Sequence, residues 1–199
     1  RVYDADGNYL MDIGSAGSEL GNLDEPSGLA IDSANGLLYV ADTWNQRVSV
    51  FSLDGTPQYT FDVRGWYDDL GNRPYLALDT ARNLLYVTDP DAGRVIVYNG
   101  QSDCIGSFGQ PRDAPVDGSQ FNIIGGIAVD QEGYVYVADS GAARVLRFAP
   151  FVDTILPPGQ PSDIEATEQL GASDVTQELQ PLGSGTDEVT SEATEEGVG

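Results

Sequence analysis

The sequence contains no histidine and no lysine, and it has a single cysteine, Cys104, in 199 residues. The absence of histidine excludes Ser-His-Asp and Cys-His catalysis within this chain. One cysteine cannot form an intrachain disulfide, and without histidine it nearly excludes a zinc site, whose usual ligands are cysteine and histidine. We therefore expect the residues of this chain to bind no metal and no cofactor.

Basic residues are also scarce, because nine arginines stand against 32 acidic residues and the formal net charge is −23. Proteins that bind nucleic acids or anionic lipid surfaces non-specifically do so through a basic field. We therefore expect no nucleic-acid partner and no direct membrane contact. No apolar run approaches the roughly 20 residues that span a bilayer, and no stretch has the composition of a signal-peptide core.

The composition changes near Pro150. Residues 1–150 contain all nine arginines and 21 acidic residues, whereas residues 151–199 contain 11 acidic residues and no basic one. No aromatic residue follows Phe151. Such a segment buries too little apolar surface to offset its ordering entropy, so we expect an acidic disordered tail or linker over 151–199. The alternative is a spacer that leads to a downstream anchor or domain.

Residues 1–150 repeat a three-part pattern. A small aliphatic segment ends in aspartate, a segment of the LYVAD type follows, and a third segment begins with Arg-Val. The copies are PSGLAID, LLYVAD and RVSVF within 26–51, PYLALD, LLYVTD and RVIVY within 74–98, and GGIAVD, YVYVAD and RVLRF within 125–148. The aspartates that end the second segments are 47 and 50 residues apart. A period in this range indicates an array, a solenoid or a propeller.

Each copy predicts short β-strands separated by turns, and no segment shows a sustained helical period. The middle strand is apolar on both faces, as expected for a sheet packed between two others. Four-stranded units of about 45–50 residues predict the blades of an all-β propeller. VYDADG at 2–7 matches VFSLDG at 50–55, which adds a truncated copy at the start. We divide the chain into a partial blade at 1–22 and blades at 23–66, 72–109 and 120–150.

An aspartate and an arginine stand five residues apart in every full copy. In an antiparallel hairpin this spacing places the two side chains opposite each other, and arginine offers a planar fork to the carboxylate. Because the pair recurs in each copy, we expect it to clamp each blade. A ring of charges around a binding mouth is the alternative. The pairs are Asp42 with Arg47, Asp89 with Arg94, and Asp139 with Arg144.

These motifs resemble the NHL repeat. GIAVD, VYVADS and RV within 126–145 carry the resemblance, as does ADTWNQRV at 41–48, whereas the copy at 76–98 departs from it at Thr88 and at PDAG, 90–93. The resemblance covers about residues 1–150 and implies a β-propeller, usually six-bladed in this family. It also implies that part of the ring is missing from this chain. We expect the strand that closes the last blade to lie upstream of Arg1.

In the propeller layout, loops between the second and third strands share one face with the loops that join blades, here 14–27, 65–73 and 109–121. Ligands usually bind on that face. Aromatic rings beside carboxylates can stack on and hydrogen-bond a sugar or a peptide; the alternative for the aromatics at 66–67 is packing at a blade junction. The candidate residues are Trp44, Asn45, Gln46, Trp66, Tyr67, Asp68, Asp69, Asp91, Arg112 and Asp113.

Two smaller features complete the search for sites. DADGNY at 4–9 begins like a calcium-binding loop, but Tyr9 and Ser15 stand where an EF-hand needs glycine and glutamate. We therefore predict no calcium site there. Cys104 begins a predicted fourth strand, and we expect it to be a small buried apolar residue.

The sequence favours a non-catalytic scaffold that binds a protein, peptide or glycan partner through its loop face. One alternative is part of a metal-dependent propeller lyase or lactonase whose catalytic residues lie in missing blades. Another is a sensor or substrate-recruiting domain of a larger protein. RNA binding, known for some NHL propellers, is disfavoured by the acidic charge. The composition favours a secreted, periplasmic or cell-surface protein of a bacterium, and it leaves the oligomeric state open.

Overall fold

The computed structural model describes residues 1–66, 73–111 and 118–152. These residues form an all-β structure with one short 3-10 turn, η1 (Ser140–Ala142). Within the described ranges, no helix has the length and apolar character needed to cross a membrane. The candidate residues Tyr67, Asp68, Asp69, Arg112 and Asp113 lie outside these ranges, as does the tail from residue 153.

The three full copies of the repeat form three antiparallel sheets, whose strands are hydrogen-bonded in chain order. Blade 1 consists of β5 (Pro26–Asp32), β6 (Leu37–Asp42), β7 (Arg47–Ser52) and β8 (Pro57–Asp62). Blade 2 consists of β9 (Leu76–Asp79), β10 (Leu84–Asp89), β11 (Arg94–Tyr98) and β12 (Cys104–Phe108). Blade 3 consists of β15 (Ile124–Val129), β16 (Val135–Asp139) and β17 (Arg144–Phe148), and the described residues include no fourth strand for it.

The remaining strands are short. The truncated copy at the start forms an antiparallel hairpin of β1 (Val2–Tyr3) and β2 (Tyr9–Met11). Two segments expected to be loops each contain a parallel pair: β3 (Ser15–Ala16) with β4 (Asn22–Leu23), and β13 (Gln110–Pro111) with β14 (Gln120–Phe121). In each segment the first and last described residues therefore run side by side. That places the entrance of the loop beside the strand it leads to.

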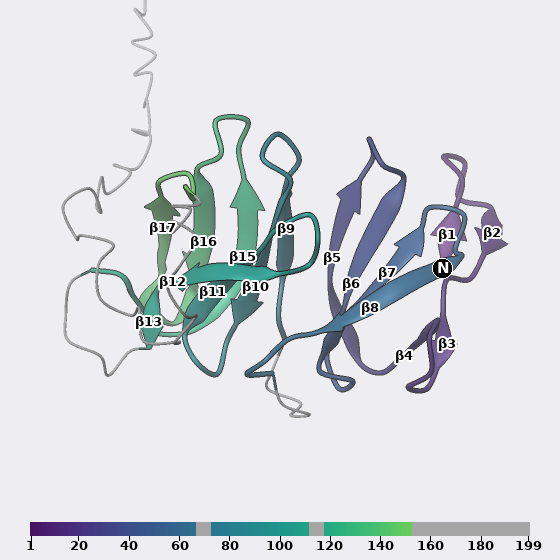
Figure 1. Cartoon of the computed structure of the whole chain (residues 1–199), viewed down its shortest axis with the longest axis horizontal. Coiled ribbons are helices and arrows are strands. Elements are labelled where there is room, and N and C mark those ends of the chain that lie inside the picture. The colour runs from purple at the N-terminus through teal and green to yellow at the C-terminus, as the bar shows by residue number, and fades with distance from the viewer. Residues whose placement is uncertain (67–72, 112–117, 153–199) are drawn as a thin grey trace, which may run out of the picture.

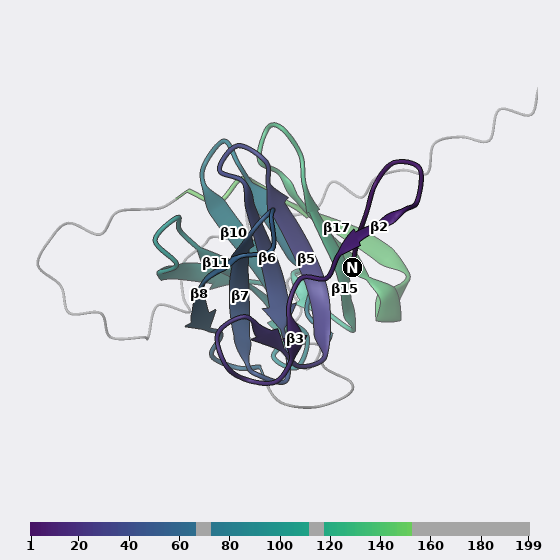
Figure 2. The ribbon, with the colours of Figure 1, turned by 90° about the vertical axis from the view of Figure 1, so that its right-hand side faces the viewer.

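The sheets stand in a row that follows the chain order, with the N-terminal hairpin at one end and blade 3 at the other (Figure 1). Viewed along the row, the sheets overlap face to face (Figure 2). The core therefore lies between the sheets, in two clusters of buried side chains. The cluster between blades 1 and 2 includes Tyr39, Val48, Val50, Leu76, Val87 and Ile96; that between blades 2 and 3 includes Tyr86, Val95, Val97, Val135, Val137 and Phe148.

Blade 2 shows why its middle strand is apolar on both faces. All six residues of β10 are buried, because one face packs on blade 1 and the other on blade 3. β5, at the inner edge of blade 1, instead alternates between buried and exposed residues. Leu29 and Ile31 on that strand are 62% and 56% exposed. Blade 1 thus has one covered face and one that is only partly covered.

Gly28 lies where the backbones of blades 1 and 2 come close together. A Cβ atom there would stand 2.7 Å from the carbonyl oxygen of Pro74 and 2.9 Å from the Cα atom of Tyr75. Because backbone cannot yield as a flexible side chain can, we expect Gly28→Ala to destabilise the fold by about 1–3 kcal/mol in urea unfolding. Gly126 occupies the equivalent position of blade 3 and has nothing within 4 Å of such an atom. Gly126→Ala is therefore the matched control, and equal losses from the two variants would contradict the close approach.

Candidate functional site

The Asp–Arg pairs lie across the hairpin that joins the second and third strands of each blade. The register pairs each aspartate directly with its arginine. The distances from arginine Nε to the carboxylate oxygen are 2.7 Å for Arg47 and Asp42, 2.9 Å for Arg94 and Asp89, and 3.1 Å for Arg144 and Asp139. All three carboxylates are fully buried. We call each pair, with the groups bonded to it, a clamp.

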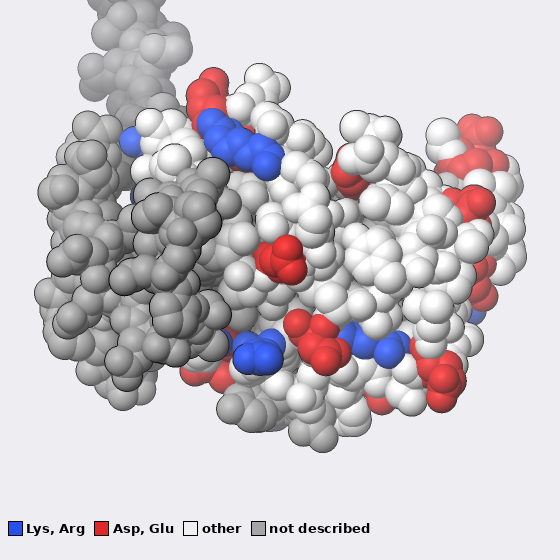
Figure 3. Space-filling model, in the orientation of Figure 1, with Lys and Arg blue, Asp and Glu red and all other residues white. Residues whose placement is uncertain are grey.

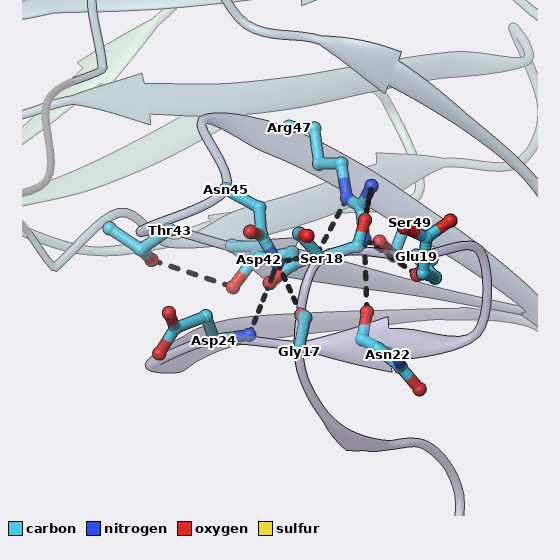
Figure 4. A network of polar contacts seen from close by, with 11 residues as sticks. Gly17, Ser18, Glu19, Asn22, Asp24, Asp42, Thr43, Asn45, Arg47 and Ser49 are labelled. Atoms are coloured by element: carbon cyan, nitrogen blue, oxygen red, sulfur yellow. Dashed lines mark hydrogen bonds and ion pairs between the residues drawn. The ribbon is translucent and has the colours of Figure 1, made fainter.

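Asp42 is the most fully bonded of these carboxylates (Figure 4). Its Oδ1 accepts a hydrogen bond from the backbone N–H of Asp24 at 2.7 Å and one from the side-chain amide of Asn45 at 2.9 Å. Its Oδ2 accepts from Arg47 and from the hydroxyl of Ser49, at 2.7 and 3.0 Å. Four groups from three separate segments thus converge on one buried carboxylate.

The arginine of each clamp also binds the segment that enters the blade. Its terminal nitrogens donate to backbone carbonyl oxygens of that segment. The acceptors are Ser18, Glu19 and Asn22 for Arg47, Arg64 for Arg94, and Gln120 for Arg144. The clamps therefore do more than pair two strands, because each fixes a loop that joins one blade to the next.

Blade 3 attaches its entering loop by the aspartate as well. The Oδ1 of Asp139 accepts hydrogen bonds from the backbone N–H groups of Asn122 and Ile123, at 2.9 and 3.1 Å. In blade 2 the entering loop packs directly against the clamp carboxylate, since a Cβ on Gly65 would stand 2.7 Å from the Oδ2 of Asp89. Gly65 has a positive φ of 108°, a conformation that favours glycine. The loop can pass over this clamp only because residue 65 has no side chain.

Burial raises the pKa of Asp89 above its ordinary value, although hydrogen bonds from Arg94 and from the N–H of Ala92 oppose the rise. An acid with a raised pKa in the folded state takes up its proton there at a higher pH than in the unfolded chain. Stability from this site is therefore greatest at low pH and falls as the pH rises through the raised pKa. We expect the free energy of unfolding of the wild type, minus that of Asp89→Asn, to decrease from about pH 4 upward and then level off. Unfolding titrations of both proteins across that range measure it; a difference that is flat or rises with pH would contradict it.

Trp66 packs at the junction of blades 1 and 2. Its side chain is 1% exposed, and its indole N–H donates to the carbonyl oxygen of Thr88 at 3.0 Å. It belongs to the same buried cluster as Val63 and Val87. Of the two roles left open by the sequence, the structure assigns Trp66 the packing role. A stacking contact with a ligand would need the ring to leave the core.

The four residues between the aspartate and the arginine of each clamp form the tips of the loop face. Asn45 is committed to the clamp, since its amide donates to both oxygens of Asp42 and to the carbonyl oxygen of Gly17. Trp44 is half-buried, and its backbone N–H donates to the carbonyl oxygen of Asp24 at 3.2 Å. Gln46 and Asp91 are exposed. Among the described candidates, Trp44, Gln46 and Asp91 are therefore at least partly exposed on this face.

Cys104 is exposed, so the expectation of a small buried residue was wrong. It does begin β12, as the sequence predicted. The reason for the error is the register, which shifts between Val97 and Tyr98 where β11 pairs with β12. That irregularity turns the first residue of the outermost strand toward solvent. A shift of this kind leaves no mark in the alternation of residues.

Within the described part of the chain, no group of three or more histidine, cysteine, aspartate or glutamate side chains lies close enough to hold a metal ion. The buried aspartates of the clamps are separated, one to each blade, and each faces arginine. What the loop face offers chemically is hydrogen bonding, a half-buried indole and negative charge.

Residues 23–51 match the sequence profile of the NHL repeat. The chain carries an NHL repeat. The matched residues hold β5, β6 and β7 with the Asp42 clamp, so the NHL repeat here is blade 1 without its outermost strand. No curated protein sequence matches the chain.

Solved structures that resemble the NHL blades of this chain are propeller-like, which agrees with the all-β architecture. A streptogramin B lyase structure superposes with a TM-score of 0.51 at 16% identity, covering 72% of this chain and 42% of that one. A protein of unknown function from Bacteroides thetaiotaomicron gives 0.51 at 20% identity, covering 61% and 32%. Hydrazine synthase from Kuenenia stuttgartiensis gives 0.50 at 14% identity, covering 71% and 36%. The chain spans less than half the length of each, and these similarities concern the fold alone.

Proposed function

We propose that this chain is a non-catalytic binding module that holds a protein, peptide or glycan partner on the loop face of its NHL blades. One observation carries the proposal: the Asp–Arg pair recurs in all three blades, whereas the four residues between the aspartate and the arginine differ. These residues are TWNQ at 43–46, PDAG at 90–93 and SGAA at 140–143. Variable loop residues on a rigid frame are the usual way in which a scaffold displays a binding surface.

The clamps supply rigidity that favours binding. Because the arginines and aspartates hold both the hairpin turns and the entering loops, the tips are ordered before any partner arrives. A pre-ordered surface loses less conformational entropy on binding. Trp44 offers a large side chain of the type that dominates binding energies. The excess of acidic over basic residues favours a basic peptide segment among the possible partners.

The test is selection followed by substitution. A displayed peptide library and a glycan array are probed with the full chain, and the selected ligands are titrated into variants. We expect Trp44→Ala to weaken binding by about tenfold or more, and Gln46→Ala with Asp91→Ala to weaken it further. The control is Gln131→Ala, an exposed residue in the turn between β15 and β16, at the opposite end of the strands. Ligands that tolerate the loop-face changes, or a search that yields no ligand, would overturn the proposal.

The enzyme alternative makes a separate prediction. If the chain were part of a metal-dependent lyase or lactonase and its own residues held the metal, Ca²⁺ or Zn²⁺ would stabilise it by binding the folded state. We expect neither ion to raise the Tm of the full chain in a thermal-shift experiment. A rise that depends on ion concentration and is reversed by a chelator would favour the enzyme.

A further inference from the structure

Blade 2 differs from the other blades in the residue that follows its clamp aspartate. Asp89 is followed by Pro90, whereas Thr43 and Ser140 follow the clamp aspartates of blades 1 and 3. Asp89–Pro90 is the only Asp–Pro bond in the sequence. The proline nitrogen belongs to a tertiary amide, which has no N–H. When such a bond breaks, a secondary amine leaves, and this amine takes up a proton readily.

The carboxyl of Asp89 is fully buried, yet few donors bind it. Its Oδ2 accepts a hydrogen bond from the Nε of Arg94 at 2.9 Å, and its Oδ1 accepts one from the backbone N–H of Ala92 at 3.3 Å. The carboxylate of Asp42 accepts from four groups, at 3.0 Å or less. Of the described clamps, the one in blade 2 thus holds its carboxyl by the fewest hydrogen bonds to the loop and strand around it.

Two donors of the blade 1 clamp have no counterpart in blade 2. Ala92 stands where blade 1 has Asn45, and Ile96 stands where it has Ser49. Neither replacement carries a side-chain donor. Burial disfavours the charged form of a carboxyl, and here it raises the pKa of Asp89 above its ordinary value. This carboxyl therefore keeps its proton at a pH where exposed aspartates have lost theirs.

The charged groups around Asp89 act in opposite directions. The guanidinium of Arg94, on β11, favours the carboxylate, whereas Asp91 at the loop tip favours the acid form. The entering loop brings Gly65 against the carboxyl and leaves Arg64 exposed. Acidic side chains also gather at the end of the row formed by β1 and β2 (Figure 3), but salt screens charges beyond about 8–10 Å. Burial and the nearest charges therefore decide the state of this carboxyl.

We propose that the chain cleaves its own Asp89–Pro90 bond in mild acid, with the carboxyl of Asp89 as the attacking group. Only Cα and Cβ separate this carboxyl from the carbonyl carbon of the same residue, so ring closure gives a cyclic anhydride within one residue. A carboxyl oxygen bonds to the carbonyl carbon as the C–N bond to Pro90 breaks, and the carboxyl proton passes to the proline nitrogen. One water then opens the anhydride, which leaves Asp89 with a free terminal carboxyl and Pro90 with a free secondary amine. This activity does not depend on a partner at the loop face.

The place of the bond in the fold suits these steps. The side chain of Asp89 is shielded from water, whereas Pro90 is half-buried at the loop tip, where water reaches the anhydride. β10 and β11 pair over five residues that end with Asp89 opposite Arg94. A cut in the loop between them therefore leaves blade 2 assembled, and the two parts of the chain separate only on unfolding.

Protonation sets an upper limit on the acceleration that burial provides. An aspartic acid with the ordinary pKa of 3.8 is about 6% protonated at pH 5. If burial kept Asp89 fully protonated at that pH, cleavage would be about 15-fold faster than in the unfolded chain. A partial effect gives a smaller factor.

The test incubates the full chain at about pH 5 for several days with protease inhibitors. Denaturing electrophoresis and mass spectrometry follow the two fragments. The same chain unfolded in urea at the same pH gives the general acid lability of an Asp–Pro bond. We expect the folded chain to cleave about 3–15-fold faster, with fragments that end at Asp89 and begin at Pro90. The bonds after Asp42 and Asp139 should stay intact.

Two variants separate the bond from its surroundings. Pro90→Ser supplies the residue that blade 3 carries there and should abolish detectable cleavage. Ala92→Asn keeps the Asp–Pro bond but restores the amide that blade 1 directs at its carboxylate, so cleavage should slow toward the rate of the unfolded chain. Ala142→Asn makes the same change in blade 3 and should cleave as the wild type does. Circular dichroism at the same pH verifies that each variant is folded.

Three results would overturn the proposal. The first is a folded chain that stays intact, and the second is equal cleavage rates in the folded and unfolded chains. The third is a wild-type rate in Ala92→Asn. The second and third would mean that the bond has only the general lability of its residue types, to which the clamp adds nothing.

Discussion

Asp42→Ala should lower the free energy of unfolding by about 3–5 kcal/mol, the range seen when one partner of a buried ion pair is removed. The substitution leaves the guanidinium of Arg47, only 13% exposed, without its carboxylate. It also removes the acceptor of the N–H of Asp24 and of the hydroxyl of Ser49. The expected loss is large because several hydrogen-bond donors lose their acceptor at once, in a region that water reaches poorly. Urea unfolding followed by circular dichroism measures it.

A surface ion pair provides the matched control. Arg1 and Asp12 are joined at 3.4 Å, but their side chains are 70% and 55% exposed. Asp12→Ala should therefore change the free energy of unfolding by less than about 1 kcal/mol. If the two substitutions have similar effects, the clamps do not stabilise the blades in the way described.

Trp66→Ala should be comparably damaging, with a loss of about 3–5 kcal/mol, as expected for removing a large buried aromatic side chain. The indole fills the junction of blades 1 and 2, so its removal leaves a cavity between two sheets. Trp66→Phe should lose less, about 1–3 kcal/mol, because it mainly deprives the carbonyl oxygen of Thr88 of a donor.

Trp44 is the matched control for Trp66, since these are the two tryptophans of the chain. Trp44 is only half-buried, so Trp44→Ala should cost less stability than Trp66→Ala. Chemical unfolding of the two variants measures the difference. A larger loss from Trp44→Ala would mean that the loop tip, rather than the blade junction, holds the structure together.

The repeat made the blades predictable. Its period, its strands apolar on both faces and its Asp–Arg spacing depend on side-chain type, which a sequence displays directly. The register of Asp42 with Arg47 follows from that spacing, and the structure has it. The all-β propeller architecture was predicted on the same grounds.

Other features could not be predicted, for physical reasons. Arg47 binds the backbone carbonyl oxygens of Ser18, Glu19 and Asn22, groups that every residue possesses, so no residue type marks the acceptors. The parallel pair of β3 and β4 has two residues in each strand, too few for any periodicity. Whether Trp66 faces the core or a ligand depends on its tertiary contact with blade 2, which the local sequence does not encode.

The central claim, that the loop face binds the partner, is tested most directly by hydrogen exchange of the full chain with and without a selected ligand. The account predicts slower exchange at the loop tips, 43–46, 90–93 and 140–143, and no change in the turns at the opposite ends of the strands, 33–36, 80–83 and 131–134. Slower exchange in those opposite turns, with the loop tips unchanged, would contradict it.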